Sequence, residues 1–152
     1  MEGLERIVAE QPFLAGLEPE HQKLISGCVR NLRFEAGSYL FRQNGPADEF
    51  YLIREGRVAL EISAPGQAPI VFSTLSEGDV VGASWVVPPY RWMFDARAIT
   101  TTRALGIDAA CLRGKCDADH DFGYAMMKRF LPILAQRLHA TRLQILDVYG
   151  KR

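Results

Sequence analysis

Two arginines, Arg91 and Arg97, lie near a glycine at a point where a run of strand-like sequence is interrupted. Gly82 opens this segment, and a pair of prolines precedes Arg91. A guanidinium is a planar fork of N–H donors that suits the oxygens of a phosphate or a carboxylate. A glycine lets backbone N–H groups approach a bound anion closely. These residue types at this spacing predict an anion pocket, with the prolines fixing the loop that presents Arg91.

The elements that must position these residues form three segments of one domain, residues 1–152. Residues 30–108 alternate large apolar residues with polar ones and are punctuated by glycines, the pattern of many short antiparallel strands. Residues 1–29 and 109–152 carry apolar residues at helical spacing. The predicted fold class is mainly β with flanking helices. It is a double-stranded antiparallel β-roll, jelly-roll-like, with N-terminal helices and a long C-terminal helix.

Turns and helix ends are predicted from glycine and proline. The sequence REGR around Gly56 predicts a β-hairpin, and residues 64–69 (APGQAP) predict a second turn. The short helix after the strands is expected to be ended by Gly114 and Asp117. Pro132 should kink the last helix or divide it into two, because proline removes a backbone donor and clashes with the preceding turn.

The last helix carries an apolar stripe in steps of four and three residues, with one polar member. Its members are Met127, Leu131, Leu134, Leu138, Thr141, Ile145 and Val148. This spacing is typical of a seam between two helices. The stripe either packs on the protein's own roll or pairs with a second copy. We favour a homodimer because Phe130, Ile133 and Leu143 offer another apolar face for the roll.

The composition is that of an ordinary soluble globular protein, with 48% hydrophobic and 24% charged residues and a formal net charge of zero. A neutral chain has no overall field that attracts nucleic acid or an anionic membrane. No apolar run approaches the length of a membrane span, and the N-terminus does not read as a signal peptide. We therefore expect a cytoplasmic protein. Its odd set of cysteines, Cys28, Cys111 and Cys116, should be reduced and partly buried.

Catalysis on such a roll is disfavoured. A metal-dependent roll enzyme of the cupin type needs histidine and carboxylate ligands that point into the barrel. The histidines, His21, His120 and His139, all fall in helical segments outside the predicted strands. No pair of a nucleophile and a base is evident either, so we expect no enzyme activity, no metal and no cofactor.

Glycines, aromatic residues and an aspartate recur at fixed spacing in the first half of the strand region, and the sequence EGDVVG follows. The positions are Phe34, Gly37, Leu40, Phe41, Gln43, Gly45, Ala47, Asp48, Phe50, Tyr51, Ile53, Gly56 and Val58. With the long final helix, this pattern resembles the cyclic nucleotide-binding domain. That domain is the β-roll sensor of catabolite activator proteins, protein kinase A regulatory subunits and gated channels. The resemblance covers most of the chain.

In that family a phosphate-binding cassette supplies a glycine, a glutamate for the ribose 2′-hydroxyl and an arginine for the phosphate. The resemblance places Gly82 at the glycine and Ala83 at the glutamate, followed by Ser84, whose hydroxyl can bond a ligand oxygen. A methyl group accepts no hydrogen bond, which implies that affinity for cyclic AMP falls by roughly ten- to a hundredfold. Trp85 stands where the family has a small or aliphatic residue, and it is a candidate to fill the ribose space.

The resemblance also implies roles for the arginines. The proline–tyrosine–arginine sequence ending at Arg91 is similar to the family's proline–arginine pair with one residue inserted, so Arg91 is the candidate phosphate ligand. Arg97 is similar to a strand arginine that some bacterial members place beneath the ligand. Two structural alternatives stay open: Arg91 stacked on Trp92 at the surface, and Arg97 paired with Asp95 or Glu61. The full candidate ligand-binding set is Gly82, Ala83, Ser84, Trp85, Arg91, Trp92, Arg97, Thr141 and Arg142.

Two functional hypotheses follow. The first is a stand-alone regulatory or sensor domain that binds cAMP, cGMP or a related anionic small molecule and signals through a dimer change or an unidentified protein partner. The alternative is a degenerate, ligand-free interaction or scaffold domain. Direct DNA binding is not expected, because too few residues follow the last helix for the recognition helix of the transcription-factor branch.

Overall fold

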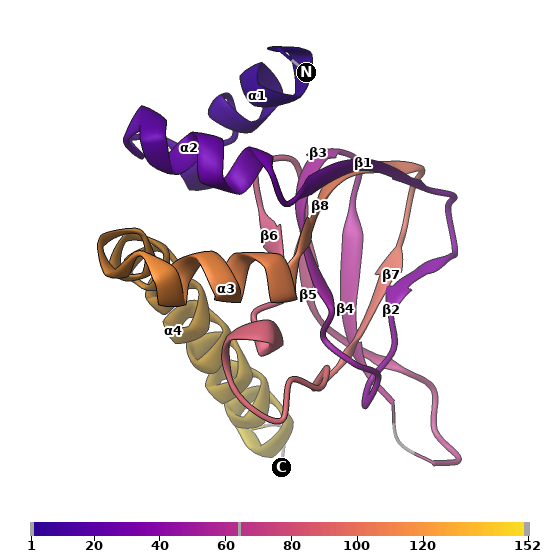
Figure 1. The fold of residues 1–152 in the computed structure, drawn as a ribbon. Helices are drawn as coiled ribbons and strands as arrows, with labels where there is room; N and C mark the ends of the chain where they lie inside the picture. The colour runs from indigo at the N-terminus through magenta and orange to yellow at the C-terminus, as the bar shows by residue number, and fades with distance from the viewer. Residues whose placement is uncertain (1, 64, 151–152) are drawn as a thin grey trace.

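The structure is a computed structural model that describes residues 2–63 and 65–150, with side chains described except at 2–3, 140–141 and 143–150. Four α-helices, two short 3₁₀ helices and eight strands make up the described chain (Figure 1). In order they are α1 (Glu2–Ala9), η1 (Pro12–Leu14), α2 (Pro19–Ser26), β1 (Val29–Phe34), β2 (Tyr39–Phe41), β3 (Glu49–Glu55), β4 (Val58–Ile62), β5 (Ile70–Leu75), β6 (Val80–Val81), η2 (Ser84–Val86), β7 (Asp95–Ala98), β8 (Thr102–Asp108), α3 (Ala109–Ala118) and α4 (His120–Gly150).

The strands form two four-stranded antiparallel sheets that enclose the core. One sheet has the order β1-β8-β3-β6 and the other β2-β7-β4-β5. The helices gather at one end of this roll, with α3 and α4 beside β6 and η2 (Figure 1). The fold class predicted from the sequence is therefore confirmed.

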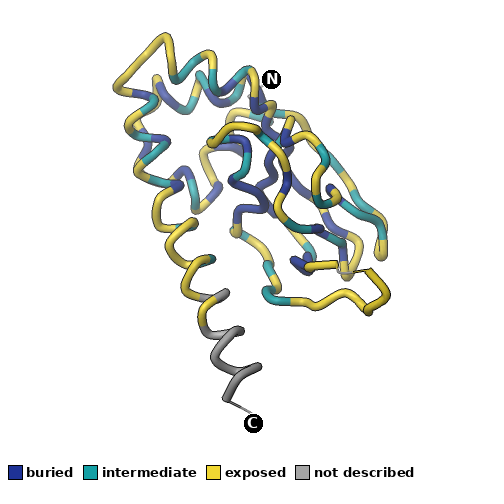
Figure 2. The backbone as a smooth tube through the Cα atoms, turned by 90° about the horizontal axis from the view of Figure 1, so that it is seen from below, coloured by how far each residue is buried: buried dark blue, intermediate teal, exposed yellow. Residues whose placement is uncertain are grey.

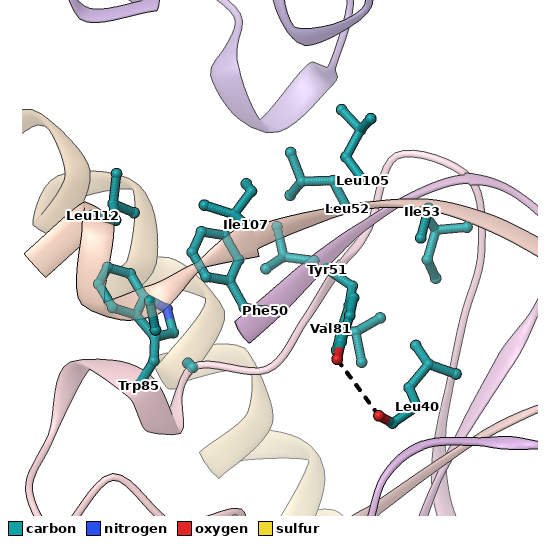
Figure 3. Close-up of a cluster of buried hydrophobic side chains, with 14 of the residues drawn as sticks. Leu40, Phe50, Tyr51, Leu52, Ile53, Val81, Trp85, Leu105, Ile107 and Leu112 are labelled. Atoms are coloured by element: carbon teal, nitrogen blue, oxygen red, sulfur yellow. Dashed lines mark hydrogen bonds between the residues drawn. The ribbon is translucent and has the colours of Figure 1, made fainter. Parts of the chain in front are cut away.

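The core is continuous from the roll to the helices. Phe50 and Ile107, from neighbouring strands, are completely buried, and so is Leu112 of α3 (Figure 3). Phe122, Met126 and Phe130 of α4 complete this side of the core, each 0–1% exposed. The middle of α4, by contrast, is largely exposed (Figure 2).

The hairpin predicted at REGR is wrong. β3 pairs with β6 and β8, whereas β4 pairs with β5 and β7 in the other sheet. Gly56 is instead the corner where the chain crosses between sheets. It has a φ of +110°, and a Cβ there would lie 2.6–2.8 Å from atoms of Thr101 and Thr102. A local turn pattern cannot distinguish a hairpin from a corner, because both need a glycine with positive φ. The second predicted turn does join a paired hairpin, β4–β5.

Two predictions about helix ends need correction. Gly114 does not end α3, which runs to Ala118, one residue past Asp117. Pro132 does not divide α4, which continues through it as one helix. Phe122, Met126 and Phe130 lie four residues apart and are buried, so packing on the core holds α4 in place up to the proline. The loss of one backbone hydrogen bond at Pro132 does not divide it.

The expectation of reduced cysteines is wrong for two of the three. Cys28 and Cys111 form a disulfide, and Cys116 is a free thiol. The two bonded cysteines are 83 residues apart in sequence. The antiparallel pairing of β1 with β8, which begins at Val29 opposite Ile107, brings them together. Sequence spacing alone could not reveal this juxtaposition.

Candidate functional site

The cassette glycine lies under an aromatic ring. Gly82 follows β6 directly and has a φ of +100°. A Cβ at this position would lie 2.6 and 2.7 Å from Cζ3 and Cη2 of Trp92. Real Cβ atoms do not approach so closely, so any other residue at this position would force the Trp92 ring to shift. The space over Gly82 is occupied by the indole of Trp92.

Trp92 belongs to an aromatic cluster inside the roll. Its ring is only 3% exposed and is stacked on Phe41, with centroids 3.7 Å apart and planes at 8°. Phe41 also contacts Tyr51 and Phe94, and Phe94 contacts Phe72 edge-on. Stacked and edge-to-face rings are favourable beyond the area that they bury. Trp92 is therefore part of the core.

Arg97 lies on the other face of its strand. Side chains alternate along β7, and Ala96 and Ala98 are completely buried toward the interior. The Arg97 guanidinium donates two hydrogen bonds, of 2.8 and 3.1 Å, to Glu61 Oε2. These bonds and the charge of Glu61 raise the pKa of Arg97 above its usual value. Of the two acidic partners proposed for Arg97, the structure contains the ion pair with Glu61. Asp95 instead accepts hydrogen bonds from the Ser63 hydroxyl and from the backbone N–H of Gln43, in the loop before β3.

Arg91 lies at the surface. Its Nη1 donates a 3.3 Å hydrogen bond to the carbonyl oxygen of Asn44, and its backbone bridges to Pro46. The side chain is exposed, while the next residue, Trp92, turns inward. In the described structure no cation–π contact joins Arg91 to Trp92. Arg91 is thus near the rim of the roll, separated from its interior by the aromatic cluster.

The residues after Gly82 pack toward the helices. Ala83 is 5% exposed, and Ser84, half-buried, begins η2. Trp85 is 1% exposed and stacks on Phe50 at 4.9 Å, with Phe130 of α4 edge-on at 5.1 Å (Figure 3). The sequence suggested Trp85 as the residue filling the ribose space. In the structure Trp92 lies over the glycine, and Trp85 joins the cassette to α4.

Arg137 of α4 also reaches the cassette. Its Nη2 donates to the carbonyl oxygen of Val80, two residues before Gly82. Burial lowers the pKa of Arg137 to about 10. The sequence pointed to Thr141 and Arg142 instead: Arg142 is exposed, and the side chain of Thr141 lies outside the described residues. Arg137 lies four residues before Thr141, so helical periodicity is the signal that would have placed it on the same face.

The inward position of Trp92 was also within reach of the sequence. From Trp92 to Ala98 every second residue is apolar, namely Trp92, Phe94, Ala96 and Ala98. Strand alternation places these four on one face and Arg97 on the other.

In the described residues, no group of three or more histidine, cysteine or carboxylate side chains could hold a metal. None of the described helices is long and apolar enough to cross a membrane.

Comparison with known proteins gives the family. A family model described as "Cyclic nucleotide-binding domain" matches residues 31–119. The chain belongs to the cyclic nucleotide-binding domain family. The match spans β1 to the end of α3 and therefore contains both sheets and the cassette.

Members of the cyclic nucleotide-binding domain family with regulatory roles are similar along most of the chain. A CRP-like cAMP-activated global transcriptional regulator of Mycobacterium tuberculosis is 25% identical over 95% of this chain, which spans 63% of the regulator's length. A putative cyclic nucleotide-binding protein of Geobacter metallireducens has a TM-score of 0.78, with 29% identity, and the match covers 91% of this chain and 100% of that one. The regulatory domain of Toxoplasma gondii PKA, solved with cAMP, has a TM-score of 0.70 at 18% identity, covering 91% of this chain and 49% of that one.

Proposed function

We propose that this chain is a non-catalytic regulatory domain whose nucleotide pocket has been converted into aromatic core, so that it acts through protein contacts. The observation that carries the proposal is the indole of Trp92 against Gly82, where a Cβ would lie 2.6 Å from the ring. A cyclic phosphate needs the same space to reach the amides beside the glycine. Trp92 and the ligand therefore exclude one another.

The polar groups of the site support the same conclusion. Ala83 offers no acceptor for a ribose hydroxyl, and a missing partner for a buried polar group costs about 1–3 kcal/mol. Arg97 is engaged by Glu61 on the outer face, and Arg91 is bonded to the Asn44 carbonyl at the rim. Neither guanidinium is directed to the space over Gly82, so the phosphate would lack its cation.

The surface through which the domain acts is an exposed stripe on α4. Leu131, Leu134 and Leu138 are 63%, 39% and 55% exposed. Exposed leucines at this spacing are typical of a helical seam, and we propose that a second copy of the chain covers them. Met127, the first seam position, is half-buried against the core. Thr141, Ile145 and Val148, the last three positions, have side chains outside the described residues. Arg137, which donates to Val80, connects this helix to the cassette.

A second candidate is a cyclic nucleotide or anion sensor in which Trp92 swings out to admit the ligand. It is favoured by the retained positive φ of Gly82 and by relatives whose names include cAMP activation or a bound cAMP. In this case Arg91 would be the phosphate ligand. Opening would sacrifice the stacking of Trp92 on Phe41, which would weaken binding further.

Isothermal titration with cAMP and cGMP tests the proposal. We expect the native protein to bind neither nucleotide at millimolar concentration. We expect the double variant Trp92→Leu/Ala83→Glu, which opens the space and restores the acceptor, to gain saturable binding of cAMP. Micromolar binding by the native protein, lost in Arg91→Ala, would establish the second candidate instead. A folded double variant that still binds nothing would show that the pocket is closed by more than Trp92.

A further inference from the structure

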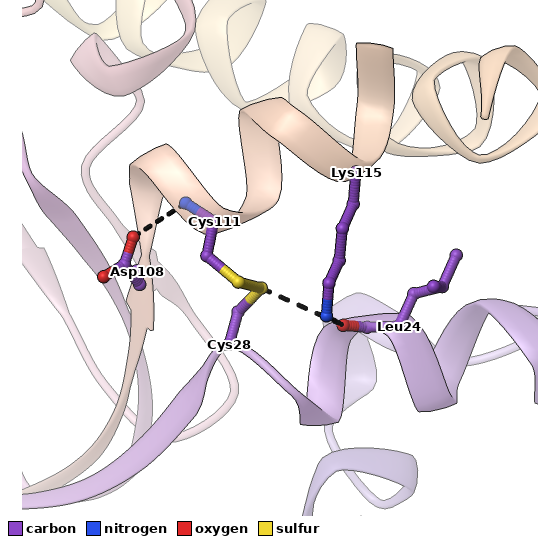
Figure 4. The surroundings of a disulfide bond; sticks show 5 residues. All are labelled: Leu24, Cys28, Asp108, Cys111 and Lys115. Atoms are coloured by element: carbon purple, nitrogen blue, oxygen red, sulfur yellow. Dashed lines mark hydrogen bonds between the residues drawn. A yellow bond between two sulfur atoms is a disulfide. The ribbon is translucent and has the colours of Figure 1, made fainter. Parts of the chain in front are cut away.

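The disulfide lies at the junction between the N-terminal helices and the C-terminal helical pair. Cys28 follows α2 and precedes β1, while Cys111 lies in the first turn of α3 (Figure 4). The two cysteines are 83 positions apart in sequence, and the segment between them includes all of the described strands. The bond therefore fixes α2 to α3 across the end of the roll.

The two bonded cysteines differ in exposure. Cys28 is 6% exposed, whereas Cys111 is half-buried. Both residues line a surface hollow of about 560 Å³ with polar walls that include Arg30 and Glu49. A hollow of this size admits a small thiol to the Cys111 side of the bond. Access is one of the main determinants of the rate of thiol–disulfide exchange.

The fold does not depend on the bond. The roll has a large core of its own, and other contacts also attach the N-terminal helices. Lys115 Nζ donates to the Leu24 carbonyl at 2.6 Å beside the disulfide (Figure 4), and Arg129 Nε donates to the Phe13 carbonyl at 3.1 Å. Domains of this size fold without covalent staples. Opening the bond would therefore loosen α2 against α3 while the sheets remain intact.

The third cysteine, Cys116, is a poor nucleophile toward the disulfide near neutral pH. Cys116 lies on α3, and burial with the nearby charges of Asp117 and Asp119 raises the pKa of its thiol to about 11. Its thiol therefore stays protonated near neutral pH, and only a thiolate attacks a disulfide. A small thiolate fraction disfavours attack by Cys116 on the Cys28–Cys111 bond.

We propose that Cys28–Cys111 is a reversible redox site, opened by low-molecular-weight thiols, that controls how firmly the N-terminal helices are held to α3. The thiolate of one small thiol attacks Cys111 Sγ, the bond to Cys28 Sγ breaks, and Cys28 leaves as a thiolate that takes a proton. A second small thiol attacks the mixed disulfide and releases Cys111. The cystine is reduced to two thiols, and two small thiols are oxidised to their disulfide. This proposal is independent of the nucleotide pocket.

The experiment equilibrates the folded native protein in buffers of graded glutathione to glutathione disulfide ratio. Thiols are counted after trapping, and hydrogen exchange is measured by mass spectrometry. We expect one free thiol in the oxidised state, three in the reduced state and a reversible transition between them. Exchange of residues 19–26 and 109–118 should accelerate on reduction by roughly tenfold or more, equal to about 1.4 kcal/mol of local stability, while β3 and β8 stay protected.

Two variants make the test specific. Cys111→Ser, at the half-buried sulfur, should have the reduced-state exchange pattern in every buffer, and Cys116→Ser should respond as the native protein does. Three trapped thiols after equilibration in the most oxidising buffer would overturn the proposal, because the bond would then not form in the folded protein. So would a cystine that glutathione reduces only after the domain unfolds, which is the behaviour of a permanent structural cross-link. Unchanged exchange in α2 and α3 after reduction would equally overturn it.

Discussion

The contact between Gly82 and Trp92 can be measured as a coupling free energy. Gly82→Ala adds two costs to folding. An L-residue at a φ of +100° costs about 1–2 kcal/mol, and a Cβ at 2.6 Å from the Trp92 ring adds about 1–3 kcal/mol of overpacking. Gly37→Ala is the matched control, because Gly37 has a φ of +88° and nothing within 4 Å of the added Cβ. It should show only the first cost.

The coupling appears in a double-mutant cycle. Trp92→Leu removes Cζ3 and Cη2, so the overpacking part should vanish when Gly82→Ala is made in that background. The free energies of unfolding, from urea titrations followed by circular dichroism, should be non-additive by about 1–3 kcal/mol. Trp92→Leu paired with Gly37→Ala should be additive within about 0.5 kcal/mol. Additivity in the Gly82 cycle would refute the reasoning that Trp92 fills the cassette space.

Three further outcomes are expected. Leu138→Asp should convert the dimer to a monomer in analytical ultracentrifugation, because it puts a charge into the seam. Gln136→Asp, at an exposed position off the stripe, should leave the protein dimeric. A native protein that is monomeric at tens of micromolar would contradict the seam. Arg97→Ala should destabilise the fold by about 3 kcal/mol in urea titration, because it leaves the buried Glu61 carboxylate unpaired, and Arg97→Ala/Glu61→Leu should recover most of this loss. The rate of alkylation of Cys116 in the folded protein should rise with pH, with a midpoint of about 11. The free energy of unfolding should fall as pH rises from about 9 through about 11, because the thiol ionises first in the unfolded chain. An alkylation midpoint near 9 would show that the thiol is not buried.

Much of the fold was predictable from the sequence because periodicity reports burial directly. Alternation predicted the strands, and apolar residues at helical spacing predicted the helices on either side of them. The errors arose where one local pattern serves two geometries. Gly56 has the positive φ of a hairpin turn but joins two sheets, and Pro132 lies in a helix that tertiary packing maintains.

The candidate site was predictable in part. The position of Gly82 and the partner of Arg97 could be derived from the motif and from nearby acidic residues. Following the family motif position by position pointed to Trp85 and gave no role inside the roll to Trp92. The strand alternation from Trp92 to Ala98 assigns Trp92 to the interior. The disulfide could not be anticipated, since only the pairing of β1 with β8 brings Cys28 to Cys111.

The most direct measurement of the central claim is the nuclear Overhauser effect between the Trp92 ring protons and the Gly82 Hα that occupies the Cβ direction. Trp92→Leu assigns the ring signals, because Trp85 is the only other tryptophan. A ring carbon 2.6 Å from the Cβ position predicts a strong effect in the free protein. We expect the same intensity in millimolar cAMP. Its absence in the free protein, or its saturable loss as cAMP is added, would contradict the account that Trp92 has replaced the nucleotide.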